Sequence, residues 1–328
     1  MKTKEKILQK LRTAPGTFFS GEDLRAELGI SRTAVWKNIQ TLREEGFSIS
    51  SVTNRGYALL EEPDILTEES IRASLSTRQI GQALRVFSVT DSTNNEAKRQ
   101  ALQGVPHGTV FVAEEQTGGK GRLGRNWVSP PGLGLWFSLL LRPHCTPQQA
   151  SRMTLLAGLA VCRALQKEIK VDARIKWPND IVIGSRKVCG ILTEMGAEME
   201  QIEYVVIGIG INIHDGCYPP ELKERAVSLD EATGKTWNRA AVLRAILTEF
   251  EEILQENERC GLQTLLSEYR SQCVTLGRTV SCSRPDGEIR GQAMGITEEG
   301  ELIIQTENGE KAVIYSGEVS VQGFYGQK

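Results

Sequence analysis

A glycine-rich loop followed by prolines constrains the fold of this chain more than any other stretch. Residues 118–127 contain four glycines, three cations and one tryptophan. Glycine lets a backbone approach a ligand closely, and clustered amides with cationic side chains attract phosphate. The loop therefore predicts a clamp over an anionic ligand. A solvated glycine-rich hairpin is the alternative that the loop by itself leaves open.

The same loop matches the G-x-G-x-x-G pattern of dinucleotide-binding folds at residues 119–124. That fingerprint must open a helix whose N-terminus holds the pyrophosphate. Here Pro130, Pro131 and two further glycines follow almost at once, so no helix can begin there. A Walker phosphate loop is absent from the sequence as well.

Length and composition indicate a soluble protein of two or three domains. The chain has 328 residues, 40% of them hydrophobic and 24% charged. It begins with Met1-Lys2-Thr3-Lys4-Glu5-Lys6 and has neither an apolar signal segment nor a run of membrane-spanning length, so a cytoplasmic location is expected. The seven cysteines show no C-x-x-C spacing and are expected to be reduced thiols.

Charge is distributed unevenly along the chain. Residues 1–60 hold five Lys and five Arg against six acids, a net charge of +4, which leaves −6 for the rest of a chain whose total is −2. A basic head on an acidic body predicts contact with nucleic acid at one end only.

The start of the chain predicts a helix-turn-helix. Apolar residues recur at helical spacing over 4–12, 21–28 and 32–45, and Ser20 and Ser31 precede the second and third of these segments as N-caps. A helix, a short turn and a second helix form the module whose second helix enters the major groove of DNA.

Two alternating segments, 47–52 and 57–60, flank Thr53-Asn54-Arg55-Gly56 and predict a β-hairpin wing. Polar side chains on the outer side of the third helix and at the wing tip can reach phosphates and base edges. We therefore predict a winged helix-turn-helix, with a small packing module that carries a solvated charged face as the alternative. The predicted DNA-binding residues are Ser31, Arg32, Thr33, Lys37, Asn38 and Arg55.

A second domain follows a predicted linker, Glu61-Glu62-Pro63-Asp64, and Thr67 is expected to cap its first helix. A strand over 85–89 runs into Asp91-Ser92-Thr93-Asn94-Asn95, ahead of another helix. These polar residues either cap that helix or bind a ligand carbonyl or ureido group, and in isolation capping is favoured. Further strands are expected at 110–113 and 135–141, with a helix from about Pro147 to Ile169 and helices near 239–256 and 261–270.

Two polar blocks in this domain suit the binding of phosphate and a hard cation. In Arg174–Ile181, Lys176 offers a point charge, and Asn179 and Asp180 offer oxygen ligands for Mg²⁺, although Pro-Asn-Asp is also an ordinary turn. Lys187 precedes Gly190 in an apolar strand. A surface lysine is the default interpretation, but a lysine beside a glycine is well suited to hold a carboxylate or an α-phosphate.

The C-terminal part of the chain changes to short strands. Turn signals at Pro285-Asp286-Gly287 and Asn308-Gly309 predict a small SH3-like β barrel. The predicted fold is α+β, with a winged helix-turn-helix at 1–62, a central mixed-sheet domain at 63–270 and the barrel at 271–328. The strands expected in the barrel are 279–281, 287–295, 301–305 and 311–315.

Several motifs together resemble those of biotin protein ligases. Asp91-Ser92-Thr93-Asn94, the loop Gly119–Trp127, Lys176-Trp177-Pro178-Asn179-Asp180 and Lys187–Glu194 occur in the order found in that family. With the winged head and the β tail, the whole chain resembles the bifunctional class that joins a biotin ligase to a biotin operon repressor. The sequence departs from the family at Lys120, where arginine is usual, and at Ala226 or Val227, where some members carry a tryptophan.

The resemblance implies a central biotin/lipoate ligase-like fold and specific roles for residues. Arg122 and Lys187 would be catalytic, and Asp180 would lie near the metal, Mg²⁺. ATP would be contacted by Lys176, Asn179, Arg125 and Asn212. Biotin and its adenylate would be held by Ser92, Thr93, Asn94, Gln116, Gly119, Lys120, Gly121, Arg122, Trp127, Lys187, Gly190 and Gly208.

The chemistry that the resemblance implies suits these residues. The biotin carboxylate must attack the α-phosphorus of ATP, and because two anions repel each other, the protein needs positioning and positive charge more than a nucleophile. A lysine of a carrier protein would then attack the mixed anhydride and release AMP.

The resemblance also implies partners. These are a biotin carboxyl carrier protein of acetyl-CoA carboxylase or pyruvate carboxylase, operator DNA, and a second copy of the chain when the adenylate is bound, without any membrane contact. Two alternatives stay open: a non-enzymatic regulator that binds biotin or a related acid, and a lipoate or octanoyl ligase on a related fold.

Overall fold

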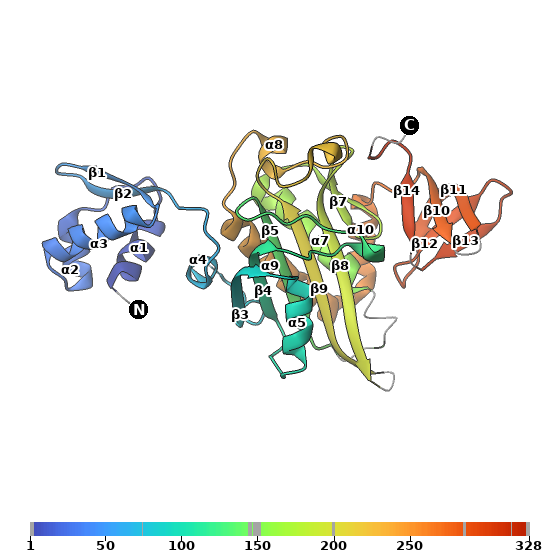
Figure 1. Ribbon diagram of the computed structural model, residues 1–328, viewed down its shortest axis with the longest axis horizontal. Coiled ribbons are helices and arrows are strands. Elements are labelled where there is room, and N and C mark those ends of the chain that lie inside the picture. The colour runs from blue at the N-terminus through green and yellow to red at the C-terminus, as the bar shows by residue number, and fades with distance from the viewer. Residues whose placement is uncertain are drawn as a thin grey trace. The chain divides into compact units, whose positions relative to one another are not determined.

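The computed structural model describes residues 3–73, 75–143, 146, 152–198, 201–284, 287–315 and 317–325. The chain divides into two compact units, Met1–Ile65 and Leu66–Lys328 (Figure 1). Each unit has its own structure and is described by itself.

The N-terminal unit packs three helices beside a two-stranded antiparallel sheet (Figure 1). Its elements are α1 (Thr3–Arg12), α2 (Gly21–Leu28), α3 (Arg32–Glu44), β1 (Ser48–Val52) and β2 (Gly56–Glu61). The predicted helix-turn-helix and its hairpin wing are therefore confirmed.

Local signals explain where the helices of this unit begin and end. The Ser20 hydroxyl accepts a hydrogen bond from Asp23 N at 3.0 Å, and the Ser31 hydroxyl accepts one from Ala34 N at 3.1 Å. Gly29 ends α2 with a φ of 65°, in the left-handed region that favours glycine. The core of the unit is formed by Ile7, Leu8, Leu11, Leu24, Val35, Ile39, Leu42, Ile49 and Leu59.

The second unit is built on a seven-stranded mixed sheet in the order β3-β4-β5-β9-β8-β7-β6 (Figure 1). β3 and β4 are parallel, and every other neighbouring pair is antiparallel. The strands are β3 (Leu84–Thr90), β4 (Thr109–Gln116), β5 (Gly134–Leu141), β6 (Ala173–Lys176), β7 (Asp180–Ile183), β8 (Arg186–Glu198) and β9 (Gln201–Asn212).

Helices cover both faces of this sheet because its central strands bury side chains on both sides. On one face Phe111, Leu140 and Val206 form a cluster with Ala97 and Ala101 of α5. The side chains that alternate with them belong to the main core, which contains α7 and α9. The helices of the unit are α4 (Glu68–Arg72), α5 (Thr93–Ala101), α7 (Met153–Ala164), α8 (Leu229–Thr233), α9 (Arg239–Cys260) and α10 (Leu262–Gln272).

Two expectations for these helices need correction. The helix expected to run continuously to Ile169 changes to a π turn at Leu165–Ile169, and its expected start at 147–151 lies outside the described residues. Ser92 occupies the N-cap position of α5, but its side chain makes no capping hydrogen bond. The capping role favoured for this segment is therefore wrong for Ser92. Thr67, by contrast, caps α4 as expected, accepting from Ser70 N at 3.0 Å.

The C-terminal strands form a five-stranded antiparallel sheet in the order β13-β12-β11-β10-β14 (Figure 1). Four were expected, and β14 was missed. Apolar side chains of this sheet, among them Val280 and Val319, belong to the same core as the central sheet. The strands are β10 (Thr279–Arg284), β11 (Gly287–Ile296), β12 (Leu302–Thr306), β13 (Lys311–Ile314) and β14 (Glu318–Val321).

Two further findings concern the described residues. Within the part of the chain that the structure describes, no helix is long and apolar enough to cross a membrane. Six cysteines are free thiols, and the seventh, Cys145, lies outside the described residues.

Candidate active site

Two adjoining cavities lie beside the glycine-rich loop and the central sheet, and the larger one also reaches the C-terminal sheet. The large cavity has a volume of about 480 Å³, and the small cavity about 50 Å³. Residues from the loop and from the two predicted polar blocks line both of them, so the motifs that are distant in sequence meet at one place. The shared lining residues are Gly121, Arg122, Trp127, Asn179 and Lys187.

The small cavity lies where the N-terminus of α5 meets the ends of β4, β8 and β9. The Gln116 side-chain oxygen accepts hydrogen bonds from Thr93 N at 2.8 Å and from the Thr93 hydroxyl at 3.1 Å. The Gln116 amide nitrogen donates to Ser129 at 2.8 Å. Ser92, which makes no cap, is 2% exposed and also lines this cavity. The polar end of the cavity is therefore held by hydrogen bonds between its own walls.

Asn94 is oriented by three partners beside the small cavity. Its amide nitrogen donates to Glu194 at 2.8 Å and to Leu192 O at 3.2 Å, and its oxygen accepts from the Ser138 hydroxyl at 2.6 Å. Lys98 pairs with Glu194 at 2.8 Å. Because donors and acceptor are all fixed, the amide can present only one orientation to a ligand. Ser138, on β5, was missed in the sequence.

Three glycines of β8 and β9 make room for the side chains above them. A Cβ atom on Gly208 would lie 2.2 Å from Asn94 Oδ1, and one on Gly210 would lie 2.5 Å from Trp127 Nε1. A Cβ atom on Gly190 would lie 2.8 Å from the Trp127 ring. These are the close approaches expected for Gly190 and Gly208, but they are made by protein side chains that wall the cavities.

Trp127 separates the two cavities. Its ring packs edge-on against Trp136 with centroids 6.3 Å apart, and the Lys187 ammonium lies 5.1 Å from its centroid. The indole Nε1 is buried and has no hydrogen-bond partner among the described residues. A buried donor without a partner is destabilising, so this nitrogen is available to a bound acceptor.

The glycine-rich loop folds back on itself as a tight hairpin with one 3-10 turn at Arg122–Gly124, and no α-helix starts there. Trp127 N donates to Gly119 O at 2.9 Å, and Gly121 N donates to Arg125 O at 2.7 Å. Leu123 has a φ of 55° and is 75% exposed at the loop tip. Lys120 reaches Asn95 Oδ1 at 3.2 Å beside the small cavity. Gly119 contributes to this hairpin through its carbonyl oxygen, which accepts the bond from Trp127 N.

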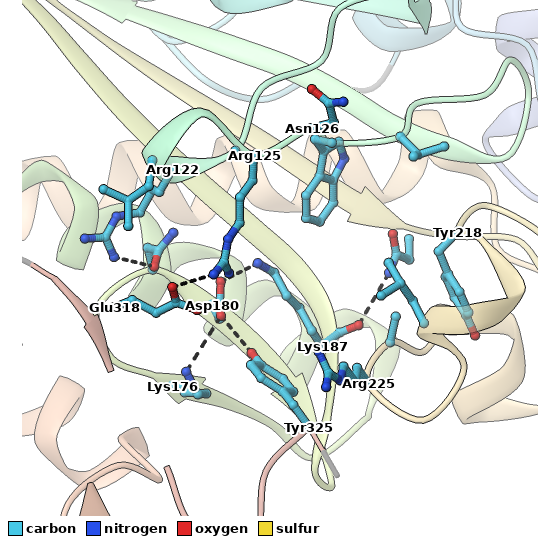
Figure 2. A pocket seen from close by; sticks show the side chains of 18 of the residues that line it. Arg122, Arg125, Asn126, Lys176, Asp180, Lys187, Tyr218, Arg225, Glu318 and Tyr325 are labelled. Atoms are coloured by element: carbon cyan, nitrogen blue, oxygen red, sulfur yellow. Dashed lines mark hydrogen bonds and ion pairs between the residues drawn. The ribbon is translucent and has the colours of Figure 1, made fainter. Parts of the chain in front are cut away.

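Two arginines join this loop to the rest of the large cavity (Figure 2). Arg122 donates to Asn179 Oδ1 at 3.0 Å and to Gly317 O at 3.0 Å. Arg125 pairs with Glu318 at the start of β14. Burial lowers the pKa of Arg122 from its usual value, although a guanidinium stays protonated. The loop is thus closed onto the C-terminal sheet.

Asp180 is a buried carboxylate that holds several cavity residues together (Figure 2). Its Oδ1 lies 2.5 Å from Lys187 Nζ, and its Oδ2 accepts from the Tyr325 hydroxyl at 2.7 Å. Lys176 Nζ is 4.0 Å from Oδ2 and donates to Val319 O at 3.0 Å. Lys187 is therefore an ion-paired cavity residue, unlike the solvated surface lysine of the default interpretation.

Burial and charge oppose each other at this cluster. Burial by itself would raise the pKa of Asp180, but the charges of Lys187 and Lys176 outweigh it and lower the pKa below the usual value. Burial lowers the pKa of Lys176. Burial and the adjacent Asp180 carboxylate raise the pKa of Tyr325 well above its usual value. Asp180 is consequently ionised and Tyr325 is a neutral donor.

Asn212 links β9 to the segment that forms the far wall of the large cavity. Its amide donates to Lys187 O at 3.4 Å and to Val227 O at 3.3 Å. Lys187 N donates to Arg225 O at 2.7 Å, and Tyr218 and Arg225 line the cavity beyond it (Figure 2). The predicted ATP residues Lys176, Asn179, Arg125 and Asn212 thus all line one cavity.

Sequence reasoning missed the cavity residues that come from remote segments. Glu318 and Tyr325 carry no local motif, and Tyr218 and Arg225 lie in an irregular stretch between β9 and α8. The strand β14, which begins at Glu318, was not recognised in the sequence.

Two of the predicted DNA-binding residues make hydrogen bonds inside the N-terminal unit, and the other four are exposed. The Ser31 hydroxyl caps α3, and Asn38 donates to Ala34 O at 2.7 Å, so both side chains are engaged inside the unit. Arg32, Thr33 and Lys37 are exposed on α3. At the wing, the Arg55 guanidinium lies 4.6 Å from the centroid of the Phe18 ring.

Three family descriptions match successive parts of the chain. An HTH domain matches residues 3–58, the Biotin/lipoate A/B protein ligase family matches 86–212, and the Biotin protein ligase C terminal domain matches 275–322. The bifunctional ligase/repressor BirA of Bacillus subtilis is 38% identical over 96% of this chain and 97% of its own length. The chain belongs to the biotin protein ligase family.

Two further comparisons cover different shares of the chain. The bifunctional ligase/repressor BirA of Escherichia coli is 32% identical over 90% of both chains, so its similarity extends through the head. The structure of the Aquifex aeolicus biotin protein ligase in complex with biotin and ATP has 35% sequence identity and a TM-score of 0.64. It covers 74% of this chain and 99% of that one.

Proposed function

We propose that the protein is an ATP-dependent biotin protein ligase that also represses transcription in response to biotin. It forms biotinyl-5′-adenylate and transfers the biotin to a lysine of a carrier protein. The observation that carries this proposal is the meeting of two cavities, one small and amide-lined, one large and cationic, at Arg122 and Lys187. Biotin fits the first cavity with its head group, and ATP fits the second.

The small cavity suits the biotin head group. A ureido group presents one carbonyl acceptor and two N–H donors. Thr93, Asn94 and Gln116 offer an ordered set of hydroxyl and amide groups for them. Ser92 and Lys120 complete this wall, and Gly190 and Gly208 leave room for the side chains of Trp127 and Asn94 beside it. Fixed partners reduce the entropy lost on binding, which favours affinity.

Adenylation is catalysed by position and charge. A biotin carboxylate oxygen forms a bond to the α-phosphorus, and the bond from that phosphorus to the pyrophosphate oxygen breaks. Lys187 and Arg122 line both cavities at the point where the two anions meet, so they offset the repulsion between them. Lys176, on the floor of the large cavity, adds positive charge. Arg122 and Lys187 are therefore the proposed catalytic residues.

Transfer then uses the same geometry. A neutral lysine amine of the carrier protein attacks the acyl carbon, the acyl–phosphate bond breaks, and AMP leaves with its negative charge facing the cations. The nitrogen gives up one proton to solvent as the amide bond forms. The loop 118–127 covers the adenylate during this interval, held by the contacts of Arg122 to Asn179 and Gly317. Water is excluded from the anhydride while the loop is closed.

Mg²⁺ enters as the complex of ATP. No group of three or more His, Cys, Asp or Glu side chains that could hold a metal ion is found among the described residues. Both oxygens of Asp180 are engaged, by Lys187 and Tyr325. The donor set does not form a resident metal site. This fits an ion carried mainly by the phosphates and water. A contact from Asp180 to that ion stays a prediction.

We further propose that the chain works as three domains with the boundaries expected from sequence, 1–62, 63–270 and 271–328. The head binds operator DNA through α3 and the wing, and adenylate binding favours a homodimer that occupies two half-sites. The acceptor is the biotin carboxyl carrier protein of acetyl-CoA carboxylase or pyruvate carboxylase. All of these partners place the protein in the cytoplasm.

The experiment is an adenylation and transfer assay on the purified chain. With ATP, Mg²⁺, biotin and an apo carrier protein, we expect AMP release and one biotin on the carrier lysine. Lipoate or octanoate in place of biotin serves as the control for the related ligases. AMP release with lipoate but not with biotin would assign the protein to that class. Biotin binding without any AMP would make it a non-enzymatic regulator.

A further inference from the structure

Trp36 is an exposed aromatic side chain on α3. It is 55% exposed, and among the described residues it makes no ring contact and no hydrogen bond. An indole is large, rigid and largely apolar, and such side chains are enriched where a protein binds a partner. Its neighbour Val35 is buried in the core of the unit, and Trp36 lies about 100° further round the helix, on an exposed flank of α3.

Cationic and polar side chains surround Trp36 on this face. Arg32 and Thr33 lie one turn before it and Lys37 follows it, and all three are exposed. Neither Arg32 nor Lys37 forms an ion pair with any described residue. Four other cations of the unit do, in the pairs Lys4–Glu45, Lys10–Glu27, Arg12–Glu62 and Arg25–Glu22. The face formed by Arg32, Thr33, Trp36 and Lys37 therefore keeps its positive charge for a partner.

A polyanion is the occupant that this face matches. Two cations flank one apolar ring, which suits a groove with phosphates along its edges and an apolar group on its floor. In the major groove the apolar group is the C5 methyl of thymine. Residues near the start of a recognition helix are those that reach base edges, and Trp36 lies in the second turn of α3.

Two residues predicted for base contact already make one hydrogen bond each inside the unit. The Ser31 hydroxyl is used as a cap, and the Asn38 amide is bonded to Ala34 O. We propose that Trp36 is a specificity-determining residue that packs its indole against a thymine methyl in each operator half-site, while Arg32 and Lys37 contact phosphates. This inference rests on the repressor part of the proposed function.

The test combines a substitution in the full-length protein with single base replacements in its DNA site. The protein, incubated with biotin and ATP, selects its site from a random duplex library, and each thymine of the selected site is then replaced singly by uracil. We expect one position in each half-site where loss of the methyl weakens binding by about fourfold, from the transfer free energy of one buried methyl group. Trp36→Ala should bind more weakly and be insensitive to uracil at that position.

Two controls separate a local effect from a folding effect. Leu60→Ala removes another large apolar side chain of the same unit, 54% exposed on β2. It should leave the uracil response unchanged. Trp36→Ala should also retain biotin ligase activity and a melting temperature close to that of the wild type, because the indole is 55% exposed and lies outside the core of the unit.

Several results would overturn the inference. Equal sensitivity of wild-type protein and Trp36→Ala to every uracil would assign the methyl contact to another residue. A change in the monomer–dimer equilibrium of Trp36→Ala without DNA, measured by sedimentation, would make this face a contact with a second copy. If the protein selects no DNA at all, the repressor function fails with it, whereas selection without a Trp36-dependent thymine removes this inference alone.

Discussion

The fit of Asn94 over Gly208 makes a quantitative prediction for Gly208→Ala. The added Cβ would lie 2.2 Å from Asn94 Oδ1, where ordinary contact begins at 3.4 Å. The amide must therefore retreat by 1.2 Å or the strand must move. Retreat breaks or lengthens the hydrogen bonds to Ser138 and Glu194, which fix the orientation of the amide.

The expected loss follows from that displacement. A misplacement of about 1 Å in a substrate-positioning group lowers catalytic efficiency by about 10²-fold. We expect kcat/KM for biotin in ATP–pyrophosphate exchange to fall by a factor of this order, with weaker biotin binding in calorimetry. The KM for ATP should stay close to the wild-type value, because neither Gly208 nor Asn94 lines the large cavity.

Gly158→Ala is the matched control. Gly158 is buried in α7, and a Cβ there would meet its nearest atoms at 3.9 Å, an ordinary contact. This variant should keep wild-type activity, and alanine in a helix interior favours stability slightly. If Gly208→Ala binds biotin with unchanged affinity and efficiency, the assignment of Asn94 to the biotin head group is refuted.

Three further predictions concern the loop, the carboxylate cluster and the head. Arg122→Gly should raise the dissociation rate of the adenylate at least about tenfold, since two hydrogen bonds of a charged group are lost. Labelling of bystander lysines measures the released adenylate. Tight retention of the adenylate would contradict the clamp role of the loop. Tyr325→Phe removes a hydrogen-bond donor to ionised Asp180 and so raises the pKa of that carboxyl. The acidic limb of the pH–rate profile should therefore move to higher pH. An unmoved limb would exclude a role for ionised Asp180 in the reaction. Removing residues 1–62 should abolish operator binding in a gel-shift assay and leave ligase activity, and retained operator binding would overturn the domain assignment.

Local signals made the head predictable. Caps at Ser20 and Ser31, a left-handed glycine at Gly29 and apolar residues at helical spacing are all short-range features, and each defines its element without help from the rest of the chain. Trp36 was not predicted as a DNA-contacting residue, because local patterns do not tell an exposed aromatic side chain from a buried one. A tryptophan beside Val35 reads as another core residue, and only the structure shows which side of the helix it occupies.

The remote half of the large cavity could not be predicted. Tyr325 reaches Asp180 from 145 positions away, and Gly317 offers its carbonyl to Arg122 across 195 positions. These contacts depend on where the C-terminal sheet packs, which no local pattern encodes. The loop glycines and the two lysines were recognisable because their chemistry is concentrated in short motifs.

The same packing explains why Asp180 sits among lysines rather than in a metal cage. Arg122, Lys176 and Lys187 converge on the place where two anions must meet, and like charges in a poorly solvated cavity repel strongly. One ionised carboxylate between the two lysines relieves that repulsion before any substrate arrives. Tyr325 holds the second oxygen of this carboxylate, so Asp180 cannot rotate to neutralise both cations fully. The cavity therefore keeps a positive surplus, which in the proposed reaction faces the biotin carboxylate and the α-phosphate. Asp180 and the nearby Glu318, which pairs with Arg125, neutralise these cations only in part, so the cavity acts as a preorganised electrostatic site.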